Sequence, residues 1–195
     1  MAITYTNRMG VTYYLCQGTT KRGRPRYYFA SAPRESAVDA LPSGYVISES
    51  INGVVSLTTA RASAILDEEA TTVETALMRH PDAHNYRVSI VRDRIVVHER
   101  VGPDPQELHE AFGISDSSFM TKRMEAYVAE RERRARFTPI LRFCLVDARV
   151  RQFVVERMTY RGEGGWLRVC SPGPVGGLAA RVIPTLGRDS FFELF

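Results

Sequence analysis

Short runs of hydrophobic and aromatic residues alternate with turn-forming residues at the start of the chain. The segments 11–17 and 26–31 are rich in β-branched and aromatic residues, and the intervening segment 18–25 holds two glycines and a proline. This pattern predicts two antiparallel strands joined by a long loop. Because that loop also carries lysine and arginine, we expect a hairpin with a basic tip.

A second hairpin is predicted where Asn52-Gly53 lies between the β-prone runs 45–50 and 54–58. Asn-Gly favours a type I′ turn, since both of its central residues need positive φ. Between the two hairpins, the segment 34–41 precedes a proline and a glycine and predicts a short helix. The first module is therefore expected to be ββαββ.

The rest of the chain alternates between helical and strand-like spacing of its apolar residues. Apolar positions three or four apart predict amphipathic helices, and β-branched runs around turns predict hairpins. The last ten residues, LGRDSFFELF, hold three phenylalanines, so we expect them to dock on the core of this second part. The expected helices cover 62–79, 105–112, 116–134 and 175–183, and the expected hairpins join 86–91 to 95–99 and 140–146 to 151–160.

Together these patterns predict an α+β fold in two parts. A small, basic, aromatic-rich ββαββ module is expected over residues 1–60, and a mixed α+β domain built of β-hairpins and helices over residues 61–195. The hydrophobic fraction of 44% and the charged fraction of 25% are those of an ordinary globular protein. The pattern leaves open whether the two parts share one core.

Composition limits the compartment and the class of protein. No apolar run approaches the roughly 18 residues that cross a bilayer, and the first residues lack the features of a secretory signal. The three cysteines, Cys16, Cys144 and Cys170, are far apart and form no CxxC pair, which argues against a disulfide framework and a structural zinc site. We therefore expect a cytoplasmic protein that does not associate with a membrane.

The charges are unevenly distributed along the chain. Residues 1–34 hold six basic residues and no acidic one, residues 35–120 hold 14 acids and six bases, and residues 121–161 hold eleven bases and five acids. Of the 26 basic residues, 24 are arginines, which bind phosphate and carboxylate through paired hydrogen bonds and stack on flat rings. A genome rich in G and C produces the same arginine bias, so the distribution is the more informative feature.

The strongest candidate site is the basic tip of the first hairpin, together with the tyrosines of its strands. Guanidinium groups at a tip can bind phosphates, and flat rings on a strand face can stack on bases. The opposing interpretation is that exposed tips are usually charged, and that a small β module needs aromatic residues in its core. Because side chains alternate along a strand, about half of these rings must face inward. The predicted nucleic-acid-binding residues are Lys21, Arg22, Arg24, Arg26, Tyr14 and Tyr28.

We therefore expect an accessory protein that contacts nucleic acid, or an acidic protein, through this tip. An alternative is a protein-interaction module that binds no nucleic acid, and a third hypothesis is a hydrolase that uses Asp82, His84 or Glu99. His80 and His84 could share a metal on a helix, but the proline between them ends the helix. The sequence lacks a GxSxG elbow, a P-loop and a dinucleotide fingerprint. We expect no catalytic residue, no metal and no cofactor, and the oligomeric state is left open.

Several segments resemble a family of bacterial proteins that has no known activity. They are TYYLCQGTTKRGRPRYYFA at 12–30, LPSGYVISESINGVV at 41–55, RFTPILRF at 136–143, FVVERMTYRG at 153–162 and IPTLGRDSFFELF at 183–195. The resemblance covers most of the chain. It implies a folded protein, and it implies no particular activity, cofactor or catalytic residue.

Overall fold

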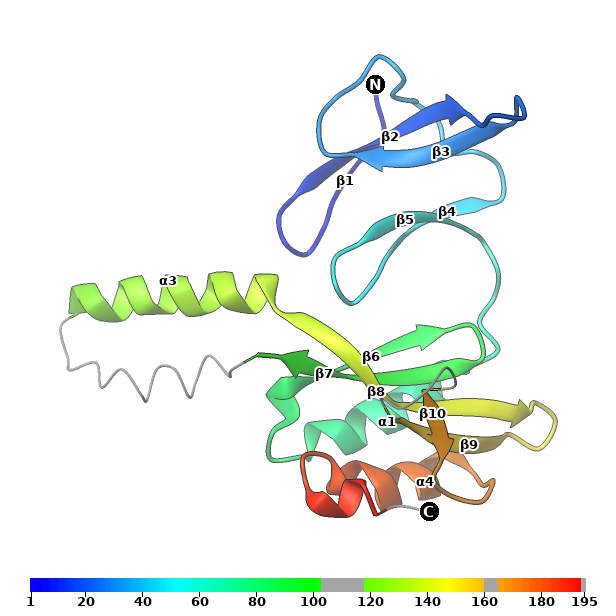
Figure 1. Cartoon of the computed structure of the whole chain (residues 1–195), viewed down its shortest axis with the longest axis vertical. Coiled ribbons are helices and arrows are strands. Elements are labelled where there is room, and N and C mark those ends of the chain that lie inside the picture. The colour runs from blue at the N-terminus through cyan, green and yellow to red at the C-terminus, as the bar shows by residue number, and fades with distance from the viewer. Residues whose placement is uncertain (103–117, 160–164, 194–195) are drawn as a thin grey trace. The chain divides into compact units, whose positions relative to one another are not determined.

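The computed structural model describes residues 1–102, 118–159 and 165–193, with the side chains of 118–124 excepted (Figure 1). The chain divides into two compact units. Unit 1 comprises Met1–Arg61 and Pro103–Arg136, and unit 2 comprises Ala62–Gly102 and Phe137–Phe195. The described residues form three α-helices and ten strands, which confirms the predicted α+β class. The helix predicted over 105–112 and the start of the one predicted over 116–134 lie outside the described residues.

Unit 1 is built mainly of two antiparallel sheets. A three-stranded sheet has the order β1-β2-β3, and β4 pairs with β5 in a two-stranded sheet. Both predicted hairpins are confirmed, and the alternation of β-branched and aromatic residues explains the strands. The elements are β1 (Thr4–Thr6), β2 (Thr12–Thr19), β3 (Pro25–Ala30), β4 (Tyr45–Glu49), β5 (Val55–Thr59) and α3 (Ser118–Arg134).

The helix predicted over 34–41 is wrong, because this segment runs beside β2 instead. Gln17 donates its backbone N–H to the carbonyl of Ser36 at 2.9 Å, and Val38 donates to the carbonyl of Leu15 at 2.9 Å. The cause is the unequal length of the strands. β1 has three residues and β2 has eight, so β1 leaves backbone groups of β2 without partners. The segment supplies them, and this requirement overrides a weak local helix preference.

Three hairpin loops of unit 1 share one geometry, which differs from the predicted type I′ turn. In each loop a glycine with positive φ follows a type I turn, the arrangement of a three-residue loop with a bulge. At the second hairpin only Gly53 has positive φ, at 73°, and Asn52 does not. The loops cover residues 7–11, 20–24 and 50–54, with glycine at 10, 23 and 53 respectively. The first residue of each loop (Asn7, Thr20 or Ser50) also accepts, through its side-chain oxygen, the backbone N–H of the last residue of that loop.

The hydrophobic register explains why the second hairpin takes the longer loop. With three loop residues, Ile47 lies opposite Leu57, and both are half-buried. A two-residue turn would shift the pairing by one position and place Leu57 opposite Ser48 instead. Because a one-residue slip moves every side chain to the other face, the apolar pair selects the three-residue loop over the Asn-Gly preference.

The buried amide of Asn7 joins the two sheets of unit 1. Asn7 is 4% exposed. Its Nδ2 group donates to the carbonyl of Gly53 at 2.7 Å, and its Oδ1 accepts from the backbone of Met9 and Val11 at 3.1 and 2.9 Å. One side chain therefore holds the β1–β2 loop and the β4–β5 loop together.

The same loop also fixes the end of α3. The Arg8 guanidinium donates to the carbonyls of Arg133 and Ala135, which are among the groups that the end of a helix leaves without intrahelical partners. The backbone N–H of Arg8 donates to Glu49 at 2.8 Å, and the Tyr5 hydroxyl donates to the same carboxylate at 2.9 Å. A cation at the carbonyl end of a helix is electrostatically favourable.

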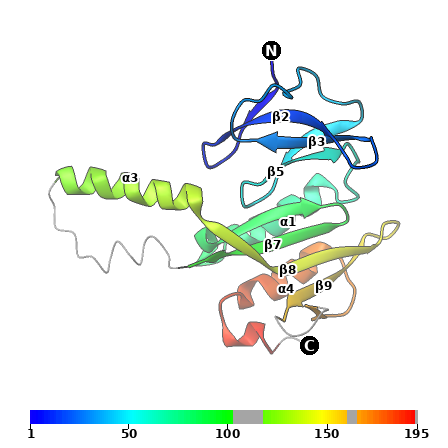
Figure 2. The same cartoon turned by 45° about the horizontal axis from the view of Figure 1, so that its top comes forward.

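Unit 2 is a five-stranded antiparallel sheet with helices on one face (Figure 1, Figure 2). The predicted hairpins and the helix over 175–183 are confirmed. None of the described helices is long and apolar enough to cross a membrane. The sheet order is β10-β9-β8-β7-β6, and the elements are α1 (Asp67–Met78), η1 (Ala83–Asn85), β6 (Tyr86–Val91), β7 (Arg94–Val101), β8 (Arg136–Asp147), β9 (Gln152–Met158), β10 (Trp166–Arg168), α4 (Val175–Val182), η2 (Ile183–Thr185) and η3 (Asp189–Phe191).

The helix predicted over 62–79 begins only at Asp67. The Ser63 hydroxyl donates to the carbonyl of Arg92 at 2.9 Å, and the Ala64 N–H donates to the same carbonyl at 3.1 Å. These bonds tie the segment to the β6–β7 turn. Ile65 is buried beside it, so the chain enters the helix later than its local pattern predicts.

The core of unit 2 lies between the sheet and the helices α1 and α4. The predicted docking of the chain's last segment is confirmed for Leu186 and Phe191, which are buried in this core, whereas Phe192 is exposed. Along β7 and β9 the core residues are two positions apart, as expected for side chains on one face, and Val96 and Val154 between them are buried as well. The residues that meet in the core include Val73, Leu77, Ile95, Val97, Leu141, Phe143, Phe153, Val155, Leu178 and Val182.

A partly buried ion pair fixes the start of α1 to the β8–β9 turn. Both carboxylate oxygens of Glu69 accept from the Arg151 guanidinium, one of them from Nε at 2.7 Å, and the Leu66 N–H donates to the same carboxylate at 2.9 Å. Burial alone would raise the pKa of Glu69. The hydrogen bonds from Arg151 and Leu66, with the charge of Arg151, outweigh it and hold that pKa below its ordinary value.

We expect Gly53→Ala to destabilise unit 1 more than Gly23→Ala does. Both glycines have nearly the same positive φ, at 73° and 77°, which costs a residue with a Cβ about 1 to 2 kcal/mol. A Cβ at Gly23 meets no atom within 4 Å, whereas one at Gly53 would lie 3.0 Å from Met9 Cε and 3.2 Å from Asn7 Nδ2. Urea unfolding, followed by the near-ultraviolet circular dichroism of the tyrosines, measures both. Equal losses would show that the Asn7 contact does not constrain the loop.

We expect Glu69→Gln to cost about 1 to 3 kcal/mol at pH 7 and much less at pH 3. The pKa of Glu69 is lower in the folded state than in the unfolded state, so the ionised carboxylate stabilises the fold above its unfolded pKa. That contribution is lost as the pH falls through the folded pKa. Urea titrations followed by Trp166 fluorescence at both pH values test this. The same difference at pH 7 and pH 3 would contradict it.

Candidate nucleic-acid interface

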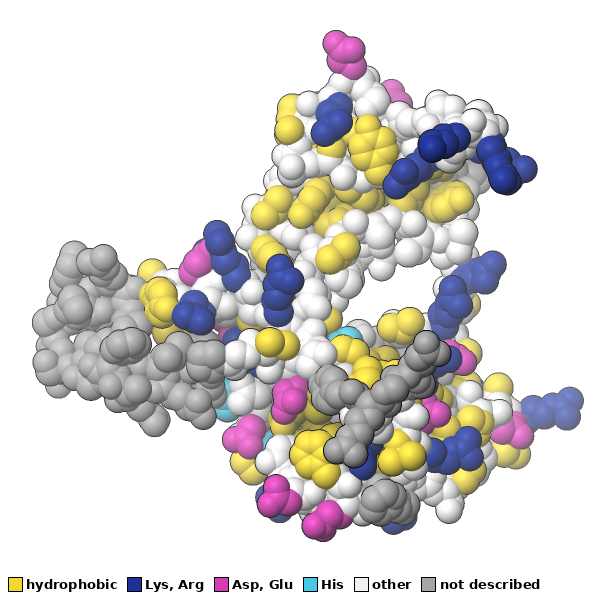
Figure 3. All heavy atoms as spheres, viewed as in Figure 1, with side chains coloured by type: hydrophobic (Ala, Val, Ile, Leu, Met, Phe, Trp, Pro, Cys, Tyr) yellow, Lys and Arg dark blue, Asp and Glu magenta, His cyan; other side chains and the backbone are white. Residues whose placement is uncertain are grey.

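The predicted basic tip is a short loop with exposed cations. Lys21 and Arg22 lie in the loop between β2 and β3, Arg24 closes it, and Arg26 follows on β3; all four side chains are exposed. Within the described residues of unit 1, none of them forms an ion pair. Figure 3 shows basic side chains gathered at this end of the β2–β3 hairpin. The tip therefore presents positive charge that no carboxylate pairs with among the described residues of its own unit.

The loop backbone holds these cations in a defined position. The Thr20 N–H donates to the Arg24 carbonyl at 2.8 Å, the Gly23 N–H donates to the Thr20 carbonyl at 2.9 Å, and the Thr20 hydroxyl accepts the Arg24 N–H at 3.1 Å. Such a loop loses little backbone freedom when a ligand binds, which lowers the entropic cost of binding.

The strand register places Tyr14, Tyr28 and Arg26 on the same face of the sheet. Tyr28 lies opposite Cys16, and Arg26 lies opposite Gly18. Gly18 leaves room for the neighbouring ring, since a Cβ there would lie 3.4 Å from Tyr28 Cε1. Both tyrosines are half-buried. An aromatic surface therefore continues directly from the basic tip.

The Tyr28 hydroxyl lies 3.2 Å from Ser36 Oγ. This contact connects the ring to the segment that runs beside β2, and it fixes the direction of the ring. A ring held in place is a better stacking partner than a mobile one, because less side-chain entropy is lost on binding.

Three other tyrosines of unit 1, Tyr5, Tyr13 and Tyr27, lie on the face of the β1-β2-β3 sheet opposite to Tyr14 and Tyr28. Tyr5 lies opposite Tyr13, and both share a face with Tyr27 by strand alternation. The Tyr27 ring lies 6.5 Å from that of Tyr45 on β4. The hydrogen bond from Tyr5 to Glu49 raises the pKa of Tyr5. Tyr5 and Tyr27 therefore contact side chains of β4 on the face away from Tyr14 and Tyr28.

Glu99 of the hydrolase hypothesis and its neighbour His98 lie on opposite faces of the sheet. Glu99 lies on the helix-covered face, where the Tyr86 hydroxyl donates to it at 3.5 Å, and burial raises the pKa of both groups. His98 lies on the opposite face, 2.8 Å from Ser89 Oγ, and burial lowers its pKa. His98 and Glu99 therefore do not act as a pair.

His80 uses both ring nitrogens in the fold. Its Nε2 contacts the Leu186 carbonyl at 3.2 Å, and its Nδ1 accepts the Asp82 N–H at 3.1 Å, which places the proton on Nε2. His80 therefore has no free nitrogen with which to join His84 in a metal site. In the part of the chain that the structure describes, no three histidine, cysteine or acidic side chains are grouped to hold a metal ion.

The structure also contains a groove in unit 2 that the sequence did not indicate. It lies between α1 and the segment formed by α4 and η2, and Arg79 and Arg188 are among its lining residues. Comparisons of the chain with protein-family models, with curated proteins and with solved structures found no match.

Proposed function

We propose that this protein is an accessory factor that binds single-stranded nucleic acid through the β2–β3 hairpin. The observation that carries the proposal is a group of four exposed cations beside a strand face that holds Tyr14 and Tyr28. None of the four forms an ion pair in the part of the chain that the structure describes. A cationic surface next to aromatic rings is the usual composition of a site for single strands.

The cations of the tip supply the affinity. Guanidinium groups bind phosphate oxygens through two parallel hydrogen bonds, and each neutralised phosphate releases condensed counterions into the solvent. Three of the four basic residues are arginines, Arg22, Arg24 and Arg26. Their bonds to phosphate do not depend on base identity, so the tip binds different sequences with similar affinity.

The tyrosine face favours a single strand over a duplex. In a duplex the faces of the bases are covered by their neighbours, whereas a single strand can lay its bases on flat side chains. Tyr14 and Tyr28 lie on the same face as Arg26. A strand whose phosphates contact Arg26 therefore has rings next to it on which bases can stack.

Binding of a fluorescent oligothymidylate should weaken steeply with salt and depend on the four tip cations. For single strands the slope of log K against log salt is about −0.7 for each phosphate contact. Replacing Lys21, Arg22, Arg24 and Arg26 by glutamine should therefore reduce the slope by about 3 and abolish binding at moderate salt. Fluorescence anisotropy over a range of salt concentrations measures this.

A control variant tests whether binding depends on the cations of the tip or only on the net charge of the protein. Arg92, Arg149, Arg168 and Arg181 are exposed residues of unit 2 without an ion pair in the described structure, and their replacement by glutamine removes the same charge. This control should bind almost as the parent protein does. Equal loss in the two quadruple variants, or no binding of DNA or RNA at low salt, would remove the proposal.

The tyrosine face should contribute affinity that salt does not change. Tyr14→Leu and Tyr28→Leu should each lower affinity for the oligonucleotide by about 1 to 3 kcal/mol and leave the salt slope unaltered. Tyr28→Phe keeps the ring and removes only the contact with Ser36, so it should bind nearly normally. If Tyr28→Leu and Tyr28→Phe bind equally well, stacking is not part of the interaction.

The exposed surface of α3 favours the alternative, a protein-interaction module. Between Glu125 and Arg134 every described side chain is exposed or half-buried, and Tyr127 is 45% exposed. A helix that buries so little within its own chain is available to a partner. A stoichiometric protein partner that co-purifies without nucleic acid and is lost in a Tyr127 variant would favour this function over nucleic-acid binding.

A further inference from the structure

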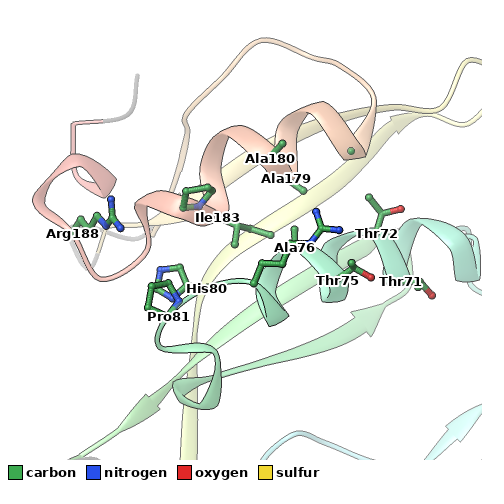
Figure 4. A pocket seen from close by; sticks show the side chains of 13 residues that line it. Thr71, Thr72, Thr75, Ala76, His80, Pro81, Ala179, Ala180, Ile183 and Arg188 are labelled. Atoms are coloured by element: carbon green, nitrogen blue, oxygen red, sulfur yellow. The ribbon is translucent and has the colours of Figure 1, made fainter.

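A groove of about 700 Å³ runs along unit 2 between α1 and the segment formed by α4 and η2 (Figure 4). This volume is in the range of sites for small molecules. In Figure 4 the threonines of α1 lie towards one end of the groove and Arg188 lies at the other. The groove is formed entirely by unit 2, so its shape does not depend on the placement of the two units.

The floor of the groove is apolar. Its accessible apolar lining comes from Ala76 of α1 and from Pro81, Ala180 and Pro184, and beneath it lie Ala179 and Ile183, which are almost fully buried. The helices approach closely at one point, since a Cβ at Gly176 would lie 3.6 Å from Thr72 Cγ2. Small side chains on both helices therefore leave a channel along the helix pair that larger ones would fill.

The polar groups of the groove are donors without an acidic counterpart. Arg79 and Arg188 are exposed and form no ion pair among the described residues, and no aspartate or glutamate lines the groove. Thr72 turns its hydroxyl back to the Glu68 carbonyl at 2.7 Å. Thr75, four residues before Arg79 and so on the same helix face, has no such bond and faces the groove.

His80 is excluded as a ligand-binding group. It lines the groove, but its two nitrogens are engaged by Leu186 and Asp82. Electrostatic recognition therefore falls to the two arginines, which come from separate elements and approach the same apolar floor. Guanidinium groups at the rim and an apolar floor fit a molecule with an acidic group and an apolar body.

We propose that this groove binds a small organic anion, a carboxylate or a phosphomonoester carried on an apolar body. The acidic group binds Arg79 or Arg188, and the body lies on the accessible apolar lining formed by Ala76, Pro81, Ala180 and Pro184. The groove belongs to unit 2 and the β2–β3 hairpin to unit 1. Anion binding in the groove therefore does not depend on nucleic-acid binding by the hairpin.

The test uses a matched set of probes and the full-length protein. Titration with 1-naphthylacetate, 1-naphthyl phosphate and the neutral 1-naphthylacetamide is followed by ¹H–¹⁵N NMR spectroscopy. The two anions should produce saturable shifts at the amides of Thr75, Arg79, Ala180 and Arg188, and the amide of the same shape should bind at least about tenfold more weakly. The stronger of the two anions identifies the acidic group.

Variants measure separately how the arginines of the groove, its apolar lining and a charge outside it affect binding of the probes. Arg79→Gln with Arg188→Gln should weaken binding of the better anion by about tenfold or more. Arg181→Gln on the exposed side of α4 removes a charge outside the groove and should have no effect. Ala180→Trp, at an exposed lining position, should block all three probes. No saturable shift with either anion, equal binding of the neutral probe, or equal effects of the groove and control variants would overturn the proposal.

Discussion

Unit 1 depends on the hydrogen bonds of one buried amide. Only a few of its described residues, among them Leu15, Cys16 and Ala30, are buried apolar side chains, so hydrophobic burial among them gives a limited driving force. Asn7 satisfies the backbone of its own loop and the carbonyl of Gly53 at once. An unsatisfied polar group at this position would cost about 1 to 3 kcal/mol, which is a large fraction of the stability of a small domain.

This constraint also decides which side chains unit 1 can offer to a ligand. Because the two sheets are held face to face, Tyr5 and Tyr27 belong to the space between them. Strand alternation then places Tyr14 and Tyr28 on the other face, next to Arg26. The aromatic face and the basic tip are therefore consequences of the packing. A change that loosened the contact between the sheets would disturb this surface without altering any residue in it.

Features governed by neighbouring residues could be predicted from the sequence, and features governed by distant contacts could not. The hairpins, the helix after Pro174 and the face shared by Tyr14 and Tyr28 follow from local alternation. The helix over 34–41 failed because β2 needed an edge partner, and the type I′ turn failed because the register of Ile47 and Leu57 decided the loop length. The sequence located the basic tip, but only the structure shows that its cations lack acidic partners among the described residues of unit 1.

The arginines of the chain fall into two classes, which differ in whether a carboxylate of the fold pairs with them. Arg151 is held by Glu69, and Arg142 is held by Glu156 and lies 4.1 Å from the centre of the Trp166 ring. Such guanidinium groups have their hydrogen bonds directed at the fold and contribute to its stability. Those of the tip and of the groove have no such partner in the described structure. An anion that binds a paired arginine must first displace the carboxylate that the arginine already contacts. The arginines of the tip and of the groove carry no such cost, so they contribute net binding energy to an anion. The location of unpaired arginines, more than the net charge of +4, is thus what points to the β2–β3 tip and to the groove beside α1.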